Sequence, residues 1–484
     1  MTEMAFRSAG ELAQAIREGE ISSLELTDLY IERIERLDTE INAVVVRDFD
    51  RARAAARQAD ADLAAGKGGG ALHGVPMTIK ESYDITGLPT TWGFVDFKEN
   101  LASSDAWIVE RYKEAGAVFM GKTNVPVALG DFQSYNPIYG QTGNPWDLDR
   151  TPGGSSGGAS AALAAGLTGL ETGSDIGGSI RNPAHFCGVY GHKPTWGIVP
   201  PQGHALPGAV ASPDIAVCGP LARSADDLKL AMDLIAAPEP LNARGWKLTL
   251  PVPRKKKLLD FRVAIWATDE HCPVDEEVAG RALDLGARLR ELGATVSETA
   301  RPEIDFTKAH VTYLELLHGV MGASMDAEQR AGLKAIAEAS DPNDLSNDAV
   351  VVRAMVASHA QWLSANNRRE KLRYAWSRFF EEWDILICPQ TATPAFLHDH
   401  GPFQQRTLEV NGEEQGYMDQ LFWAGAITAP YLPSTVFPTG PSQAGLPIGL
   451  QAVSGEYEDQ TTIEFARLMS DMLGGFVVPP GYAS

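Results

Sequence analysis

Cysteine is scarce in this chain, with four residues among 484, and no two of them form a Cys-x-x-Cys pair. Sparse, unpatterned cysteines exclude a disulfide framework and fit a reducing compartment, so we expect a cytoplasmic protein. The histidines add no metal signature, because His398 and His400 lack a partner at a helical or finger-like spacing. We therefore expect neither a metal ion nor a cofactor.

Positive charge is also in short supply. The chain has 41 Lys and Arg against 63 Asp and Glu, a net charge of −22. Nucleic-acid surfaces need clustered Lys and Arg, so we expect no nucleic-acid partner. No apolar run is long enough to span a bilayer, and the first residues lack the basic start and apolar stretch of a signal peptide, so we expect no membrane association.

Hydrophobic residues make up 44% of the sequence, which is enough for a large core. In the second half, residues 262–267 predict a strand, 274–292 a helix and 294–296 a returning strand. Residues 348–383 predict one long helix, and 384–388 a buried strand after it. This alternation of strands and helices predicts an α/β layered fold.

Two glycine-rich segments each carry a serine that suits nucleophilic catalysis. Ser155 lies in residues 153–158 (GGSSGG) and Ser179 in residues 175–181 (DIGGSIR). A serine hydroxyl is a weak nucleophile until a base takes its proton. Neighbouring glycines let backbone N–H groups approach a substrate oxygen without obstruction by a side chain.

The first of these segments has three other interpretations. A flexible linker is disfavoured because residues 159–166 (ASAALAAG) are small helix formers, so the loop opens a helix. A phosphate-binding loop would continue with Gly-Lys-Ser or Gly-Lys-Thr, which is not present. The segment also fits the G-x-S-x-G nucleophile elbow, but the elbow needs an apolar strand before it, and residues 144–152 are polar and bounded by proline.

Lys80 differs from an ordinary solvated lysine in its sequence context. It ends the apolar stretch Val75 to Ile79, which predicts a buried strand. A lysine acts as a base only when neutral, and burial lowers its pKa because the charged form loses hydration. None of the ten histidines stands in a motif that marks it as a base.

Together with residues 74–81 (GVPMTIKE), the two serine segments resemble the pattern of the amidase signature family. The resemblance extends over about residues 12–234 and returns near the C-terminus. Its further elements are residues 121–124 (GKTN), 144–146 (NPW), 190–195 (YGHKPT) and 446–451 (LPIGLQ).

The resemblance implies a Ser-cis-Ser-Lys triad. Ser179 falls on the nucleophile, Ser155 on the bridging serine that follows a cis peptide bond, and Lys80 on the base. The backbone N–H groups implied for the oxyanion hole are those of Ile176, Gly177, Gly178 and Ser179, and the implied supporting residues are Ser156, Asp175 and Arg181.

The resemblance also implies one domain over residues 1–484, with a large twisted mixed β-sheet flanked by helices on both faces. The signature core would span about residues 70–235, and the variable substrate-pocket region about residues 241–437. We expect a small-molecule substrate and a monomer or homodimer. Three aromatic residues are candidates for an apolar pocket: Trp92, Tyr135 and Trp423.

The implied reaction is hydrolysis of amides or carbamates, and of aryl esters, through an acyl-enzyme on Ser179, as in a stand-alone urethanase-like enzyme. Two alternatives remain open. One is the glutaminase subunit of a tRNA-dependent amidotransferase, which the acidic composition disfavours. The other is a catalytically silent binding subunit with the same fold, which the intact set of Lys80, Ser155 and Ser179 disfavours.

Overall fold

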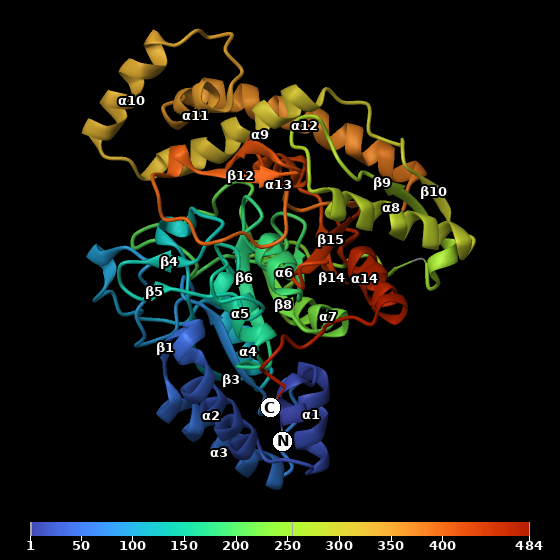
Figure 1. Cartoon of the computed structure of the whole chain (residues 1–484). Coiled ribbons are helices and arrows are strands. Elements are labelled where there is room, and N and C mark those ends of the chain that lie inside the picture. Colours follow the sequence, from blue (N-terminus) through green and yellow to red (C-terminus); the bar gives the residue numbers. More distant parts are fainter. Residues whose placement is uncertain (1, 254, 484) are drawn as a thin grey trace.

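The computed structural model describes residues 2–253 and 255–483 (Figure 1). Within these residues the α-helices are α1 (Ala9–Glu18), α2 (Ser23–Ile41), α3 (Phe49–Ala64), α4 (Trp107–Glu114), α5 (Gly157–Ala164), α6 (Arg181–Cys187), α7 (Ala225–Ile235), α8 (Glu276–Glu291), α9 (Phe306–Met321), α10 (Ala327–Ala339), α11 (Asn347–Met355), α12 (His359–Glu382), α13 (Leu421–Thr428) and α14 (Asp459–Leu473). The strands are β1 (Val44–Arg47), β2 (Pro76–Lys80), β3 (Val118–Thr123), β4 (Tyr135–Asn136), β5 (Gly140–Gln141), β6 (Glu171–Asp175), β7 (Tyr190–Lys193), β8 (Val217–Ala222), β9 (Arg262–Ile265), β10 (Thr295–Ser297), β11 (Ile385–Cys388), β12 (Thr407–Val410), β13 (Glu413–Gly416), β14 (Ser434–Pro441) and β15 (Pro447–Val453).

The large sheet is mixed. Within the described residues eight strands form it, in the order β10-β9-β11-β15-β14-β7-β8-β6. Strand β9 pairs in parallel with β10 and β11, and the other neighbouring strands are antiparallel. Every residue of β6, β7, β8, β11 and β15 is buried. Because alternate side chains of a strand point to opposite faces, both faces are covered, which confirms the predicted sheet between helical layers.

A second, three-stranded sheet places Lys80 beside the large sheet. It has the order β1-β3-β2, and β2 runs parallel to β3. All five residues of β2 are buried, which confirms the predicted buried strand before and including Lys80. Strand β2 contacts β6 and α5, so its last residue lies next to both serine segments.

The predicted elements of the second half are mostly confirmed. Strands β9, β10 and β11 and helix α8 lie where the patterns place them, to within two residues. The single long helix over 348–383 is wrong, because the chain forms α11 and α12 with a break between them. Ser358 caps α12: its side chain accepts the N–H of Gln361, and the Gln361 side chain accepts the N–H of Ser358.

Helices α9 to α12 gather at one end of the molecule, and both termini lie toward the opposite end (Figure 1). Helix α13 packs against α9 beneath this group. Of the helices in the described part of the chain, none has the length and apolar character required to cross a bilayer.

Candidate active site

Lys80 contacts two serine hydroxyls at the end of β2. Its Nζ lies 2.6 Å from Ser155 Oγ and 3.0 Å from Ser174 Oγ, and the lysine side chain is fully buried. The sequence predicts Ser155 here, whereas no motif singles out Ser174. Ser174 is the penultimate residue of β6, so the adjacent strands β2 and β6 bring the two side chains together.

The surroundings of Lys80 favour its neutral form. Burial lowers the pKa of Lys80 to about 7, although the nearby acidic side chains act in the opposite direction. One of these acids, Asp175, is paired with Arg181. The other, Glu171, accepts a hydrogen bond from the Thr78 hydroxyl, and burial raises the pKa of Glu171 to about 8. The partners in direct contact with the amine are therefore hydroxyl groups.

The segment that carries Ser155 is a tight turn at the start of α5. The Gly154–Ser155 peptide bond is cis, as the resemblance implies. The N–H of Gly154 donates to Asn182 Oδ1 at 3.0 Å, and a Cβ on Gly154 would lie 2.2 Å from the carbonyl oxygen of Asp131. Only glycine fits this position. No strand precedes the turn within residues 144–152, which agrees with the rejection of a nucleophile elbow.

A backbone hydrogen bond joins the two serine segments. The N–H of Ser156 donates to the carbonyl of Ser179 at 3.1 Å. The chain therefore holds Ser155, which touches Lys80, in the segment directly beside the one that carries Ser179. Lys80 and Ser155 are thus in direct contact, and a backbone hydrogen bond holds the segment of Ser179 beside that of Ser155.

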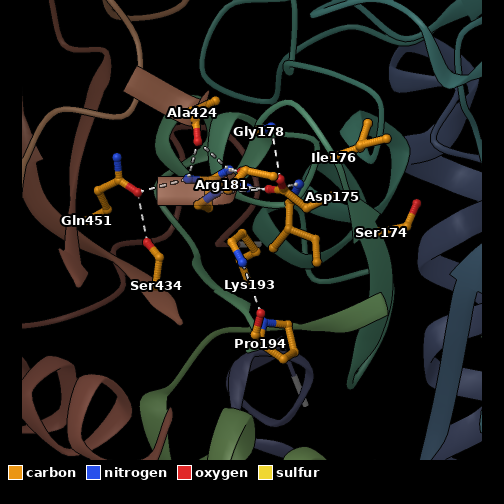
Figure 2. A network of polar contacts seen from close by, with 12 residues as sticks. Ser174, Asp175, Ile176, Gly178, Arg181, Lys193, Pro194, Ala424, Ser434 and Gln451 are labelled. Carbon is orange, nitrogen blue, oxygen red and sulfur yellow. Dashed lines mark hydrogen bonds and ion pairs between the residues drawn. The ribbon is translucent and has the colours of Figure 1, made fainter. Parts of the chain in front are cut away.

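Asp175 fixes the loop that leads to Ser179. Its carboxylate accepts the N–H groups of Gly178 at 2.9 Å and Ile180 at 3.1 Å, and it pairs with Arg181 at 2.9 Å (Figure 2). Burial alone would raise the pKa of Asp175, but the charge of Arg181 and these hydrogen bonds lower it to about 2. The carboxylate therefore stays ionised and holds the loop over the working pH range.

Arg181 extends this network to distant parts of the chain. Its guanidinium donates to Gln451 Oε1 at 3.1 Å on β15 and to Thr428 Oγ1 at 2.8 Å on α13. Figure 2 shows Arg181 between Asp175 on one side and Gln451 on the other, with the carbonyl of Ala424 close by. The loop is thereby tied both to the sheet and to α13.

The backbone N–H groups of the loop divide into two sets. That of Gly178 is taken by Asp175, whereas those of Ile176, Gly177 and Ser179 have no protein acceptor among the described residues. Gly178 has a φ of +104°, and a Cβ there would lie 2.3 Å from Gln390 Nε2. The positive φ favours glycine at this position, and any larger residue would also displace the Gln390 side chain.

Ser179 opens onto a cavity of about 190 Å³ and is itself 8% exposed. The loop residues Ile176 and Gly177 form one side of it. The remaining lining residues come from four other parts of the chain: Leu129, Gly130, Asp131 and Phe132; Leu317, His318 and Met321 of α9; Met355 of α11; and Phe403, Met418 and Leu421.

The three aromatic pocket candidates lie outside this lining. Trp92 donates its Nε1–H to the carbonyl of Ser82, and Tyr135 stacks on His400 at 3.9 Å. Trp423 is fully buried, packs on Trp266 and donates its Nε1–H to the carbonyl of Cys272 at 3.0 Å. Each of the three side chains thus makes its hydrogen bond or ring contact with residues outside the cavity lining.

Sequence patterns do not mark the individual side chains of most of the cavity wall. Its side chains are mainly leucine, methionine and phenylalanine, which are also among the commonest core residues. Their spacing along the sequence does not distinguish residues of a cavity wall from residues of the hydrophobic core. In the parts of the chain that the structure describes, no group of three or more His, Cys, Asp or Glu side chains is placed to hold a metal ion.

Comparison with known proteins identifies the family. Residues 25–463 match the family described as Amidase. The chain is 34% identical to an indoleacetamide hydrolase of Bradyrhizobium diazoefficiens, over 96% of this chain and 86% of that protein. It is 32% identical to a glutamyl-tRNA(Gln) amidotransferase subunit of Moorella thermoacetica, over 96% of both.

Among solved structures, a bacterial aryl acylamidase of the amidase signature family superposes with a TM-score of 0.81 at 25% identity, over 96% of each chain. The agreement in fold therefore extends along nearly the whole length of both proteins. The chain belongs to the amidase signature family and is a hydrolase of the carbon–nitrogen bonds of amides.

Proposed function

We propose that Ser179 is the nucleophile, Lys80 the base and Ser155 the residue that relays the proton between them. Ser179 Oγ forms a bond to the substrate carbonyl carbon, and its proton passes through Ser155 to the neutral amine of Lys80. The tetrahedral intermediate then collapses, the C–N bond breaks, and the relay returns the proton to the leaving nitrogen. The products of this half-reaction are the free amine and an acyl-enzyme.

One observation carries this proposal: a fully buried lysine with a pKa of about 7 touches the hydroxyl of Ser155 at 2.6 Å. An amine with this pKa is neutral in a large fraction of molecules near neutral pH, so it can accept a proton. Catalytic bases work best when their pKa lies near the working pH. The same relay would then activate water, which attacks the acyl-enzyme and releases the acid.

The oxyanion in this proposal is received by the N–H groups of Ile176, Gly177 and Ser179. These donors are unpaired in the described structure, so they cost no protein hydrogen bond when the oxyanion forms. The N–H of Gly178, expected as a fourth donor, is bonded to Asp175. We assign it to holding the loop in shape, together with Ser156 and Arg181.

We assign an apolar amide, with a small aromatic group, as the substrate. The cavity beside Ser179 is walled by leucine, methionine and phenylalanine, and its 190 Å³ is below the roughly 300–1,000 Å³ of sites for drug-sized ligands. A single aromatic group suits this volume better than a long acyl chain. The similarity to an indoleacetamide hydrolase and to an aryl acylamidase supports the same class.

Carbamates and aryl esters belong to the proposed range because the same oxyanion site serves each carbonyl type. We place the enzyme in the cytoplasm, since its four cysteines are buried free thiols, which suits a reducing compartment. It would act there as a monomer or homodimer.

The second candidate function is that of a glutaminase in an amidotransferase, which the 32% identity to the Moorella thermoacetica protein supports. Glutamine brings an ammonium and a carboxylate that lose hydration in an apolar cavity. The one acidic side chain in the lining, Asp131, is already paired with Arg406 at 2.7 Å. The cavity therefore favours the apolar amide.

A hydrolysis panel tests the choice. Phenylacetamide, an aryl acetanilide, an aryl carbamate, an aryl ester and glutamine are offered to the purified enzyme, and release of amine, phenol or ammonia is followed. We expect turnover of the aryl amides and none of glutamine. Turnover of glutamine alone would favour the amidotransferase role, and no turnover of any compound would favour a silent binding subunit.

A further inference from the structure

Two polar side chains other than that of Ser179 line the cavity, and they differ in what they can offer a substrate. Asp131 accepts from Arg406 with one carboxylate oxygen and from the Tyr417 hydroxyl with the other. Both of its oxygens therefore already have protein donors. The other is His318, near the end of α9 and 9% exposed.

The tautomer of His318 is fixed by its own helix. The Nδ1 atom lies 3.0 Å from the carbonyl oxygen of Leu314, one turn earlier. A carbonyl oxygen only accepts, so Nδ1 carries the hydrogen. In a neutral imidazole the other nitrogen, Nε2, is then a bare acceptor. Burial lowers the pKa of His318, which keeps the ring neutral at and above neutral pH.

Among the described residues Nε2 has no hydrogen-bond partner. It is also absent from the set of unpaired polar atoms that are fully buried, so it remains accessible. An atom that is unpaired and still accessible, on a side chain that lines the cavity, can be reached by a ligand. Around it the wall is apolar, with Leu317 and Met321 from the same helix and Met355 from α11. A donor brought into such surroundings gains more from one acceptor than it would in water.

We propose that His318 is a specificity-determining residue whose Nε2 accepts a hydrogen bond from an O–H or N–H group on the aromatic part of the substrate. The substrate class is thereby narrowed from small aryl amides to those with a hydrogen-bond donor on the ring. This inference rests on the proposed function, because it assigns the cavity beside Ser179 to the aryl group. It involves no covalent step.

Matched pairs of substrates test the proposal. Hydroxyphenylacetamides and methylphenylacetamides are compared in ortho, meta and para forms. Within each pair, a hydroxyl group that can donate a hydrogen bond replaces a methyl group of similar size. At the favoured position, we expect His318→Phe to lower the hydroxyl-to-methyl ratio of kcat/KM about tenfold, the usual value of one hydrogen bond. An unchanged ratio at all three positions overturns the proposal.

Two further variants separate hydrogen bonding from shape. In His318→Gln the amide oxygen can take the place of Nε2, so the preference for the hydroxyl compound should be retained. Met321→Leu alters the same wall without touching an acceptor, so it should shift both members of each pair alike. A loss of preference in Met321→Leu as large as in His318→Phe would contradict a role for the histidine acceptor.

Binding to Ser179→Ala distinguishes failure of this inference from failure of the proposed function. Dissociation constants of the same pairs are measured by calorimetry on Ser179→Ala and on Ser179→Ala combined with His318→Phe. A donor preference that depends on His318 supports the subsite even if the wild-type enzyme turns over none of the compounds. Turnover of the compounds without any such preference, in rate or in binding, overturns the subsite and leaves the proposed function intact.

Discussion

The segment that carries the two serines and the region that walls the cavity differ sharply in how they are packed. Residues 151–195 are buried throughout except for Ile176, which is half-buried at the cavity. By contrast, the cavity-wall residues Met321, Met355 and Met418 are only half-buried. The candidate catalytic residues thus lie in fully packed backbone, whereas part of the cavity wall consists of half-buried side chains, whose replacement should disturb the packing less.

The largest expected effect is on the serine at the border of these two regions. Ser179→Ala should lower turnover by at least about 10,000-fold, because no other group replaces the nucleophile. Its melting temperature should stay near that of the wild type, since Ser179 lines the cavity and the change removes a single oxygen atom. Steady-state rates and thermal unfolding measure both.

Ser160→Ala is the matched control for this variant. Ser160 is a buried serine of α5 whose hydroxyl has no partner among the described residues. It should keep wild-type turnover. Near wild-type turnover in Ser179→Ala would instead remove Ser179 from its assigned role and return Ser155 as the candidate nucleophile.

The next effect concerns the base. Lys80→Ala should lower turnover about 100- to 10,000-fold, the usual contribution of a general base. Because the neutral amine is the active form, the wild-type rate should rise as the pH increases through about 7 and level off above it. A pH–rate profile of the wild type and of the variant measures this.

Lys193→Met provides the control for the pH profile. Lys193 is also buried, and burial lowers its pKa to about 7, but its amine donates to the carbonyl of Pro194 and contacts neither serine. The rise near pH 7 should survive in Lys193→Met. If that rise disappears with Lys193 and persists in Lys80→Ala, the assignment of the base is wrong.

A third effect is on stability and compares a buried ion pair with an exposed one. Arg181→Met leaves Asp175 as an unpaired charge in the core, which should cost about 3–5 kcal/mol of unfolding free energy. Arg262→Met removes the partly exposed pair with Asp384 and should cost about 1 kcal/mol or less. Denaturant unfolding of both variants measures the difference, and equal losses would contradict the role given to burial.

The smallest expected effect is a change in substrate ranking, which distinguishes core residues from cavity-wall residues near α13. Trp423→Ala should lower stability by about 3–5 kcal/mol and leave the ranking among amide, carbamate and ester unchanged, because the ring is buried outside the cavity. Met418→Ala should do the reverse, with a change of about tenfold in the ranking, as expected for pocket methylenes. Relative turnover and melting temperature on both variants decide, and an altered ranking in Trp423→Ala would bring that ring back into the pocket.

How far the sequence predicts the structure depends on which region is considered. The motifs predict the cis bond before Ser155, which the structure contains, and they lie in glycine-rich backbone that has few alternative conformations. The structure places Lys80 against Ser155 and joins the two serine segments by a backbone hydrogen bond. Hydrophobic periodicity likewise locates β2, β9 and β11. These are properties of short, continuous segments.

The individual residues of the wall could not be predicted within the expected region 241–437, for the opposite reason. Helix α13 (LFWAGAIT) is apolar around its circumference, so the sequence does not reveal that Leu421 faces the cavity while Trp423 faces Trp266. The role proposed for His318 depends on a hydrogen bond to a carbonyl of its own helix and on cavity residues that are distant in the sequence. The break before Ser358 escapes prediction because its capping box lies inside a continuous helical pattern.

The most direct measurement of the central claim is peptide mass spectrometry after incubation with a serine-reactive fluorophosphonate. We expect one adduct, on Ser179, formed in the wild type and much more slowly in Lys80→Ala, because the buried amine activates that hydroxyl. An adduct on Ser155 or on another residue, or labelling of Ser179 at the same rate without Lys80, would contradict it.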